Sequence, residues 1–539
     1  MIEMQVGLLT LLKEFDTICR KHGITYYLEG GSLLGAVRHK GFLPWDDDID
    51  LSITRENFQK LLSVIDEELP ENRELYCYER FPNYLRDTVK YTNLDTTVLF
   101  RNHILDGNAA GQHIDLFILD PVPADEKAQA EYKKNATIYS ELLTPVYVLC
   151  EDIADYFEEY QQYLQMMEER GRDYVLDLFR KKLFTYEDSD DCDTYLLRWG
   201  NRHMFYPKEW FGTPVELQFE DGCFPAPSQY YRFLRRQFGD TWMIIPDAAH
   251  QEEHNTFDNY NVPCKTFIAD YAGFIDYEAY RRDNVERKQH NVCLLREKKQ
   301  LAKLDAVNYY VMKNAEQKAL TAALSEEAKT MLGQEAYGEF LELYEPYYKA
   351  QLSNACVRYG MAITADPAVV HACAFSMTMM GNFGQAEKLI RAAKTESPEL
   401  DELMEMISDI RGCVLAEEEG RYTDAKELAG KWSSRYPQQK TLAVFAVNQG
   451  IREDRAPTEL AFRVQELLEQ YPDSDELMFL MGKLLDQQNF REGAIGWYRR
   501  CQEITRNGML LMQIPELLPV EEETEADEMS DEERVNNDE

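Results

Sequence analysis

The chain has 539 residues, enough for about three domains at roughly 100–200 residues per domain. Its 58 Lys and Arg residues stand against 97 Asp and Glu residues, so the formal net charge is −39, which argues against binding of nucleic acid or of anionic membranes and requires a metal ion or a local cationic pocket for any polyanionic substrate. The hydrophobic fraction of 44% is typical of a folded protein, and the eleven cysteines without a Cys-x-x-Cys pair indicate reduced thiols in the cytosol.

The N-terminal part of the chain, residues 1–275, is predicted to be an α/β or α+β domain. Its first 23 residues carry charges through an apolar pattern, which indicates an amphipathic helix rather than a signal peptide. Short β-type runs at 25–29, 48–53 and 113–120 alternate with segments of helical periodicity. Residues 151–200 have a helical period throughout and are predicted to form a helical insertion in this domain.

A glycine-rich segment follows the first predicted strand. Gly30, Gly31 and Ser32 are expected to form a turn before a short helix. Glycines at such a turn let the backbone approach a phosphate closely, and the N–H groups at the start of the next helix point at the same anion. A loop interrupted by Gly41 and Pro44 then leads to the second predicted strand.

Two aspartates begin that second strand. Because side chains alternate along a strand, Asp48 and Asp50 should leave the same face. Carboxylates that close raise each other's pKa unless a cation lies between them, and oxygen ligands suit Mg²⁺ or Mn²⁺. Asp115, in the otherwise apolar run 113–120, is the candidate third carboxylate, whereas Asp120 is expected to cap or turn its strand. We therefore predict a metal site of Asp48, Asp50 and Asp115 that activates an attacking oxygen and neutralises a leaving diphosphate.

The second half of the chain is predicted to be helical. Residues 276–330 nearly lack Gly and Pro and are expected to form connecting helices. Residues 331–515 keep a helical periodicity, and residues 516–539 are predicted to form a disordered tail, because 521–539 contain eleven acidic residues and hardly any hydrophobic ones.

Within 331–515 the sequence repeats. Pro367, Pro398, Pro437 and Pro472 follow one another at 31, 39 and 35 residues, close to the 34 residues of a tetratricopeptide repeat. The earliest unit is expected to have its second helix over 355–362. We predict repeats of this type that offer a docking surface for a protein partner, with an irregular helical bundle as the alternative.

The run GGSLLGAVRHKGFLPWDDDID, residues 30–50, closely resembles the signature of the LicD family, the phosphocholine-type transferases related to fukutin. A looser patch resembles the family as well, with Phe219, Glu220, Asp221, Pro225, Tyr231, Leu234, Phe238, Gly239, Asp240 and Pro246. The resemblance covers about 20–260 and implies a nucleotidyltransferase-like domain with a mixed sheet. The superfamily pattern of Gly-Gly/Ser and paired carboxylates maps onto Gly31, Ser32, Asp48 and Asp50, with Asp115 as the later carboxylate.

The resemblance implies Mg²⁺- or Mn²⁺-dependent transfer of a phospho-substituted group, typically phosphocholine, from a CDP-linked donor such as CDP-choline. The acceptor would be a sugar of a cell-surface glycan, such as teichoic acid or lipopolysaccharide, or of its lipid-linked precursor. Arg38 and Lys40 could neutralise the donor diphosphate, and Lys90 is a further candidate phosphate contact. His39 is interpreted as a packing residue rather than a general base. The aromatic residues that would hold choline are left open among Tyr26, Tyr27, Trp45, Tyr91, Trp210 and Trp242.

Two other functions are kept open: a nucleotidyltransferase acting on a protein or small molecule, and a non-catalytic interaction protein whose repeats bind a partner. No run of about 18 apolar residues occurs, so we expect a cytoplasmic protein without a transmembrane segment, in solution or peripheral at the inner face of the membrane. The segment from His250 to His254 matches a zinc-peptidase pattern, but Pro246 and Asn255 flank it closely and we interpret the match as chance.

Overall fold

A computed structural model describes residues 2–99, 111–144, 146, 148–184, 192–199, 202–239, 241–246, 257–271 and 276–517. The pattern at 250–254 and the acidic stretch 521–539 lie outside these residues. The chain divides into two compact units, residues 1–442 and 443–539, so the boundary falls inside the region of predicted repeats.

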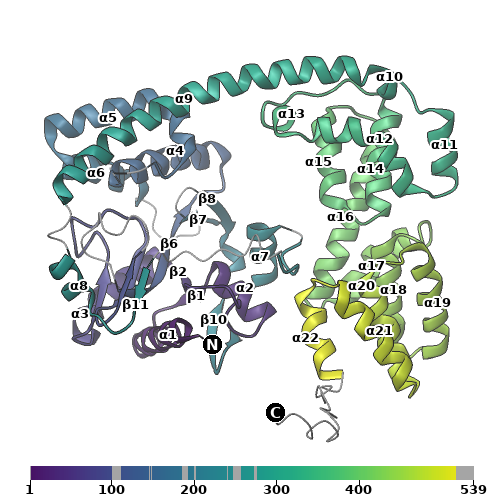
Figure 1. Cartoon of the computed structure of the whole chain (residues 1–539), viewed down its shortest axis with the longest axis horizontal. Coiled ribbons are helices and arrows are strands. Elements are labelled where there is room, and N and C mark those ends of the chain that lie inside the picture. The colour runs from purple at the N-terminus through teal and green to yellow at the C-terminus, as the bar shows by residue number, and fades with distance from the viewer. Residues whose placement is uncertain are drawn as a thin grey trace, which may run out of the picture. The chain divides into compact units, whose positions relative to one another are not determined.

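The first unit contains a seven-stranded mixed sheet, as the resemblance implies (Figure 1). Its order is β1-β2-β6-β4-β3, and β7 pairs with the far half of β6 and with β8. Only β2 and β6 run parallel; every other pair of the sheet is antiparallel. The strands are β1 (Tyr26–Leu28), β2 (Asp50–Thr54), β3 (Arg73–Tyr76), β4 (Val89–Asn93), β6 (Gln112–Val122), β7 (Thr194–Trp199) and β8 (Arg202–Pro207).

Three helices from the first 70 residues pack on this sheet. They are α1 (Glu3–His22), α2 (Gly30–Arg38) and α3 (Arg55–Glu68). The charges of α1 lie on its outer side while its apolar residues join the main core, which confirms the predicted amphipathic helix. Two short hairpin-like sheets complete the region: β9 (Val215–Phe219) with β10 (Gly222–Ala226), and β5 (Thr97–Leu99) with β11 (Phe257–Asn259).

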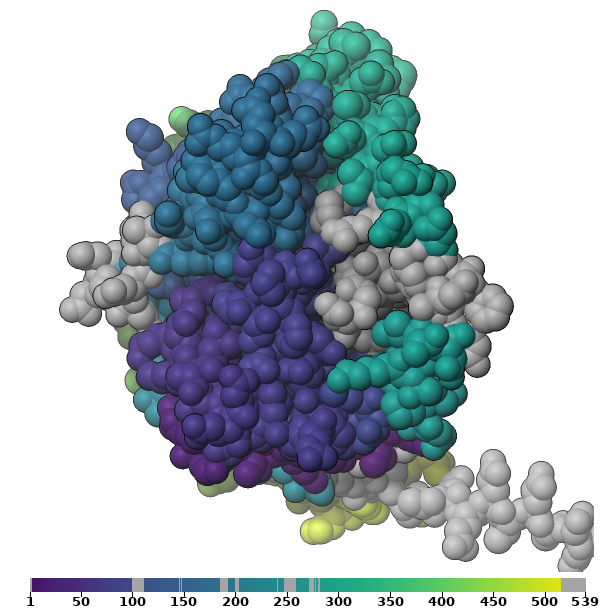
Figure 2. Space-filling model, turned by 90° about the vertical axis from the view of Figure 1, so that its left-hand side faces the viewer, coloured from purple at the N-terminus to yellow at the C-terminus, as the bar shows by residue number. Residues whose placement is uncertain are grey.

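A second core forms under the insertion. The helices α4 (Glu126–Leu143), α5 (Phe157–Arg170) and α6 (Arg172–Leu183), with the 3-10 turn η2 (Glu151–Tyr156), bury their apolar faces together. Figure 2 shows them as a blue lobe above the purple N-terminal residues. The predicted extent of the insertion to residue 200 is wrong, because 194–199 form β7. The apolar run Tyr195–Leu197 pairs there with the end of β6, which overrides its helical spacing.

Most of the segment predicted to connect the halves is one 40-residue helix, α9 (Tyr277–Glu316). A buried ion pair fixes it to the insertion: the Lys288 ammonium lies 2.7 Å from the Glu141 carboxylate and donates to the carbonyl oxygens of Glu141 and Thr144. The other carboxylate oxygen of Glu141 accepts from the N–H groups of Leu149 and Cys150. One charge pair thus joins three segments of the chain.

The rest of the described chain is helical, as predicted. Helices pack as consecutive pairs, α14 with α15, α16 with α17, and α20 with α21. Their bounds, after α7 (Tyr230–Phe238), α8 (Cys264–Tyr271) and α10 (Lys318–Thr321), are α11 (Glu326–Gly333), α12 (Tyr337–Gln351), α13 (Asn354–Arg358), α14 (Pro367–Met379), α15 (Phe383–Ala393), α16 (Pro398–Glu418), α17 (Tyr422–Ser433), α18 (Lys440–Arg452), α19 (Pro457–Gln470), α20 (Asp475–Gln487), α21 (Arg491–Ile504) and α22 (Gly508–Leu517).

The earliest predicted repeat unit is not formed as expected. Its second helix was predicted over 355–362, but α13 ends at Arg358. Gly360 has φ of 63°, a left-handed conformation that terminates helices and that glycine adopts without steric cost. The spacing of alanines and a proline in this stretch therefore matched the repeat pattern without a full helix to carry it.

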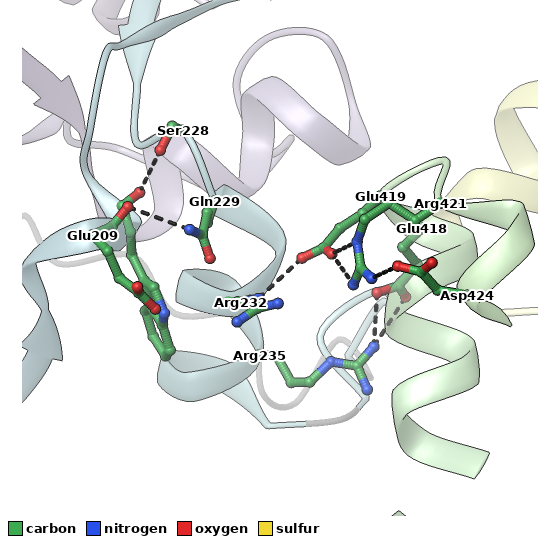
Figure 3. Close-up of polar contacts among 10 residues, drawn as sticks. Glu209, Ser228, Gln229, Arg232, Arg235, Glu418, Glu419, Arg421 and Asp424 are labelled. Carbon is green, nitrogen blue, oxygen red and sulfur yellow. Dashed lines mark hydrogen bonds and ion pairs between the residues drawn. The ribbon is translucent and has the colours of Figure 1, made fainter. Parts of the chain in front are cut away.

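Polar contacts join the sheet region to the helices within the first unit (Figure 3). Arg232 of α7 lies 3.0 Å from the carboxylate of Glu419, and Arg235 lies 2.9 Å from that of Glu418 at the end of α16. Arg421 also pairs with Glu419. A single exposed ion pair contributes about 0–1 kcal/mol, so this contact gains its strength from several charges acting together.

Replacing Lys288 by Met should leave Glu141 charged and buried without its partner. We expect the free energy of unfolding to fall by about 3–5 kcal/mol, measured by urea denaturation. Lys298→Met, on the exposed side of the same helix, is the matched control and should change the stability by less than about 0.5 kcal/mol. Equal effects of the two substitutions would show that the buried pair does not anchor α9.

Candidate active site

The register of three neighbouring strands places the charged residues in one row. Asp50 on β2 stands opposite Asp115 on the parallel strand β6, and Asp115 stands opposite Lys90 on β4. Backbone bonds hold this end of the sheet together, with the N–H of Asp115 donating to the carbonyl oxygen of Ile49 at 2.9 Å. The side chains of the row therefore lie side by side although they are up to 65 residues apart in the sequence.

The glycine-rich segment is helix rather than turn. Gly30, Gly31 and Ser32 are the first residues of α2, directly after β1, so the predicted separate turn is wrong. The Ser32 hydroxyl oxygen accepts from the N–H of Asp50 at 3.0 Å, and its O–H can still donate to a ligand. Ser32 thus connects the start of the helix to the start of β2 and positions Asp50.

The predicted strand also begins later than expected. Asp48 is half-buried and precedes β2, whose first residue is Asp50. Strand alternation therefore does not explain their proximity. The charge of Asp48 nevertheless acts on Asp50, so the two carboxylates lie near each other.

Electrostatics at this point of the sheet are unfavourable for a carboxylate. Burial raises the pKa of Asp50 well above its ordinary value, and the negative charges of Asp48, Asp115, Asp46 and Glu29 raise it further. A positive charge placed among these carboxylates would reverse this effect. The arrangement is that of a cation site rather than of a solvated acidic turn.

Asp115 has the opposite shift. Burial acts to raise its pKa, but the charge of Lys90, whose ammonium lies 3.4 Å from the carboxylate, outweighs burial and lowers it. His113 lies 3.7 Å away and has its own pKa lowered to about 4 by burial and by Lys90, so it is neutral near pH 7. Lys90, only 2% exposed, therefore balances the aspartates from inside the sheet, which differs from the phosphate contact predicted for it.

The other predicted cations divide into one buried and one exposed residue. Arg38 donates to the carbonyl oxygens of Trp242 and Ile244, both at 3.1 Å, and burial lowers its pKa to about 10, so it stays charged at neutral pH. Lys40 is exposed and has φ of 61°. Their contact with a donor phosphate stays a prediction. The pKa of His39 is lowered to about 4 by burial and by Arg38, and its ring lies against Trp45, consistent with a packing residue.

Three carboxylates that sequence reasoning did not select shape the site. Glu29 is buried, which raises its pKa to about 8, and accepts a hydrogen bond from Gln237 at 3.2 Å. The Asp46 carboxylate lies so close to Gly31 that a Cβ there would be 2.6 Å from its oxygen. Glu220 accepts from the N–H of Phe42 at 3.0 Å and closes the loop after α2. Glu220 belongs to the second resembling patch, but nothing in the sequence indicated this contact.

The candidate aromatic residues differ in exposure. Tyr26 and Tyr91 are fully buried and pack on Phe15, so they belong to the core. Trp45 and Trp210 are only partly buried. A cavity of about 820 Å³ opens at the opposite end of β2, where Thr54 and Arg55 line it, and it does not include the aspartates.

The residues fit a divalent cation in chemistry. Mg²⁺ commonly binds through one or two carboxylates and completes its shell with water and substrate phosphates. The raised pKa of Asp50 shows that its carboxylate lacks a compensating charge. Among the described residues, no three His, Cys, Asp or Glu side chains already form a metal site, since Asp115 is paired with Lys90. Asp48 and Asp50 are the pair best placed to bind the ion.

Comparison with known proteins bears on the same segment. Residues 23–147 match the family model described as LicD/FKTN/FKRP, nucleotidyltransferase domain. The N-terminal region is a LicD domain. This LicD domain contains the whole row of charged residues, from Glu29 to Asp115.

The relatives are glycan-directed transferases by name. Lipopolysaccharide cholinephosphotransferase LicD of Haemophilus influenzae is 28% identical over 278 residues, 48% of this chain and 97% of that protein. Ribitol 5-phosphate transferase FKRP of human and mouse is 60% identical over 35 residues, 6% of this chain and 7% of the relative. The solved P58(IPK) TPR domain aligns with 46% of this chain and 75% of its own, at 13% identity and a TM-score of 0.25, a score too low for a conclusion about the fold.

Replacing Asp50 by Asn should stabilise the metal-free protein. Because the pKa of Asp50 is raised on folding, its charged form destabilises the native state at neutral pH, and this cost disappears below the ordinary carboxyl pKa. We expect a higher melting temperature than wild type in chelator at pH 7, with the difference shrinking as the pH falls towards 4. A lower melting temperature at neutral pH would contradict the electrostatic assignment.

Proposed function

We propose that this protein transfers a phospho-substituted group, phosphocholine or a similar one, from a CDP-linked donor to a sugar hydroxyl of a glycan or its lipid-linked precursor. The observation that carries the proposal is the register of Asp50 and Asp115 beside Asp48, in a LicD domain. The similarity to a lipopolysaccharide cholinephosphotransferase over nearly its whole length supports the same reaction class.

Asp48 and Asp50 would hold Mg²⁺ or Mn²⁺, with Asp115 as the adjacent third carboxylate. The bound ion would supply positive charge for the donor diphosphate, which the carboxylates by themselves would repel. The acceptor oxygen attacks the phosphorus that carries the choline-type substituent, and the bond to the leaving cytidine monophosphate breaks. Transfer of this kind depends mainly on positioning and charge neutralisation.

The chain's own residues would position the donor. The N–H groups at the start of α2 and the Ser32 hydroxyl face the end of β2, where Asp50 lies. Gly31 keeps room for the Asp46 carboxylate against the helix. Lys40, on the exposed loop after α2, is the cation most accessible to a diphosphate.

Asp48→Asn and Asp50→Asn variants should lose turnover of CDP-choline by at least about a hundredfold, because the ion would lose a carboxylate ligand. Release of cytidine monophosphate in the presence of Mg²⁺ and acceptor measures this. Asp66→Asn, an exposed aspartate on α3, is the matched control and should retain wild-type turnover. Full turnover by the folded Asp48 and Asp50 variants would disprove the assignment.

Calorimetric titration with CDP-choline, CTP and ATP, each with Mg²⁺, separates the alternatives. Preference for CDP-choline supports the proposed reaction. Preference for a triphosphate would instead indicate a nucleotidyltransferase, and no binding of any nucleotide would indicate an interaction protein.

A further inference from the structure

The solvent-facing side of α9 carries an apolar stripe. Leu301, Leu304, Val307, Val311 and Met312 are all exposed, with 60% of Leu301, 63% of Leu304 and 59% of Val311 accessible to solvent. Their spacing of three, three, four and one residues keeps them on one side of the helix. Figure 1 shows the second half of α9 continuing beyond the helices of the insertion.

The opposite side of α9 is the one that packs. Lys288, Val292 and Ala306 are buried, and at 100° per residue they lie on the side of the helix away from the stripe. The stripe is therefore not a core face left open by a small shift of the helix. Singly exposed apolar residues need no explanation, but five within three turns of one helix indicate a contact surface.

Cations border the stripe on a strongly acidic chain. Arg296, Lys299, Lys303 and Arg358 line a shallow cavity of about 420 Å³ between α9, α13 and η2. Arg296 pairs with Glu158 and Lys299 with Asp155, both at 2.8 Å. Among the described residues, no carboxylate pairs with Lys303 or Arg358, and both side chains are exposed.

The local charge is opposite to that of the whole protein. Residues 294–313 contain five Lys and Arg and two Asp and Glu, so this stretch has a net charge of +3 in a chain of −39. Unpaired cations beside exposed Leu and Val residues are the features of helices that lie in the interface of an anionic bilayer. The apolar side chains enter the acyl boundary while the cations contact lipid phosphates.

We propose that the second half of α9, with Arg358, binds the surface of a membrane that contains anionic lipids. The expectation from net charge, that this protein does not bind anionic membranes, is thereby restricted to the rest of its surface. Within the described residues, no helix is both long and apolar enough to span a bilayer, so the attachment would be peripheral. A second copy of the chain fits less well, since five side chains cover much less than the ~800 Å² per partner of a standard interface.

Vesicle flotation of the full-length protein tests the proposal without donor or acceptor, so its outcome is independent of the proposed reaction. We expect binding to vesicles of phosphatidylglycerol and phosphatidylcholine in equal parts, weaker binding to pure phosphatidylcholine, and loss of binding as salt is raised. Leu301→Glu/Leu304→Glu should weaken binding at least about tenfold. Lys303→Gln and Arg358→Gln should each weaken it roughly fivefold.

Matched controls lie elsewhere on the surface. Phe462→Glu replaces a side chain that is 75% exposed, and Lys388→Gln replaces an exposed lysine outside the cluster. Both should bind like wild type, and all variants should unfold at the wild-type urea concentration because the altered side chains are exposed. The proposal is overturned if wild type binds neither vesicle. It is also overturned if the leucine variant keeps vesicle binding while light scattering shows a dimer becoming a monomer, since a second copy would then cover the stripe.

Discussion

The structure depends on keeping like charges together at one end of a mixed sheet. Parallel pairing of β2 with β6 sets Asp50 directly opposite Asp115, and the loop before β2 adds Asp48. Such a cluster opposes folding unless positive charge is supplied. The fold supplies part of it from Lys90 on the next strand, which holds Asp115 charged. Asp50 is left without an equivalent partner, and a divalent ion with a diphosphate donor would provide the remainder.

Neighbouring segments hold the cluster in place through backbone groups. Ser32 accepts from the N–H of Asp50, and Glu220 accepts from the N–H of Phe42, so α2 and the loop after it are bound from both sides. Arg38 donates to carbonyl oxygens of Trp242 and Ile244, far along the chain. Residues of the second resembling patch thus support the first. This explains why the likeness to the LicD family extends well beyond the aspartates.

Charge is distributed unevenly over the rest of the molecule. The acidic residues that give the chain its charge of −39 lie mostly on helices, where they pair with Lys and Arg or face solvent. The second half of α9 is an exception, with unpaired cations and an exposed apolar stripe on one helix. An enzyme whose acceptor is a lipid-linked glycan would gain from such a surface, because it would hold the LicD domain near its substrate.

Much of the site could be predicted from the sequence. The glycines, Ser32 and the paired aspartates follow one another at close spacing, so a local motif was enough to select them and to identify a cation site. Strands and helices with a clear period were predicted as well. Where two periodicities overlapped, the prediction was wrong: Tyr195–Leu197 form part of β7 because pairing with β6 outweighs local spacing, and α13 stops at Gly360.

The sequence by itself thus determined the chemistry of the site, because carboxylates and glycines in one short run carry their own geometric and electrostatic requirements. Only the tertiary structure decided which charges balance them. Lys90 is 25 residues before Asp115 and looked like a phosphate contact, but strand register places it opposite that aspartate. The same holds for α9: its cations disappear in a net charge of −39, and only folding separates them from the acidic residues and aligns them with the exposed leucines.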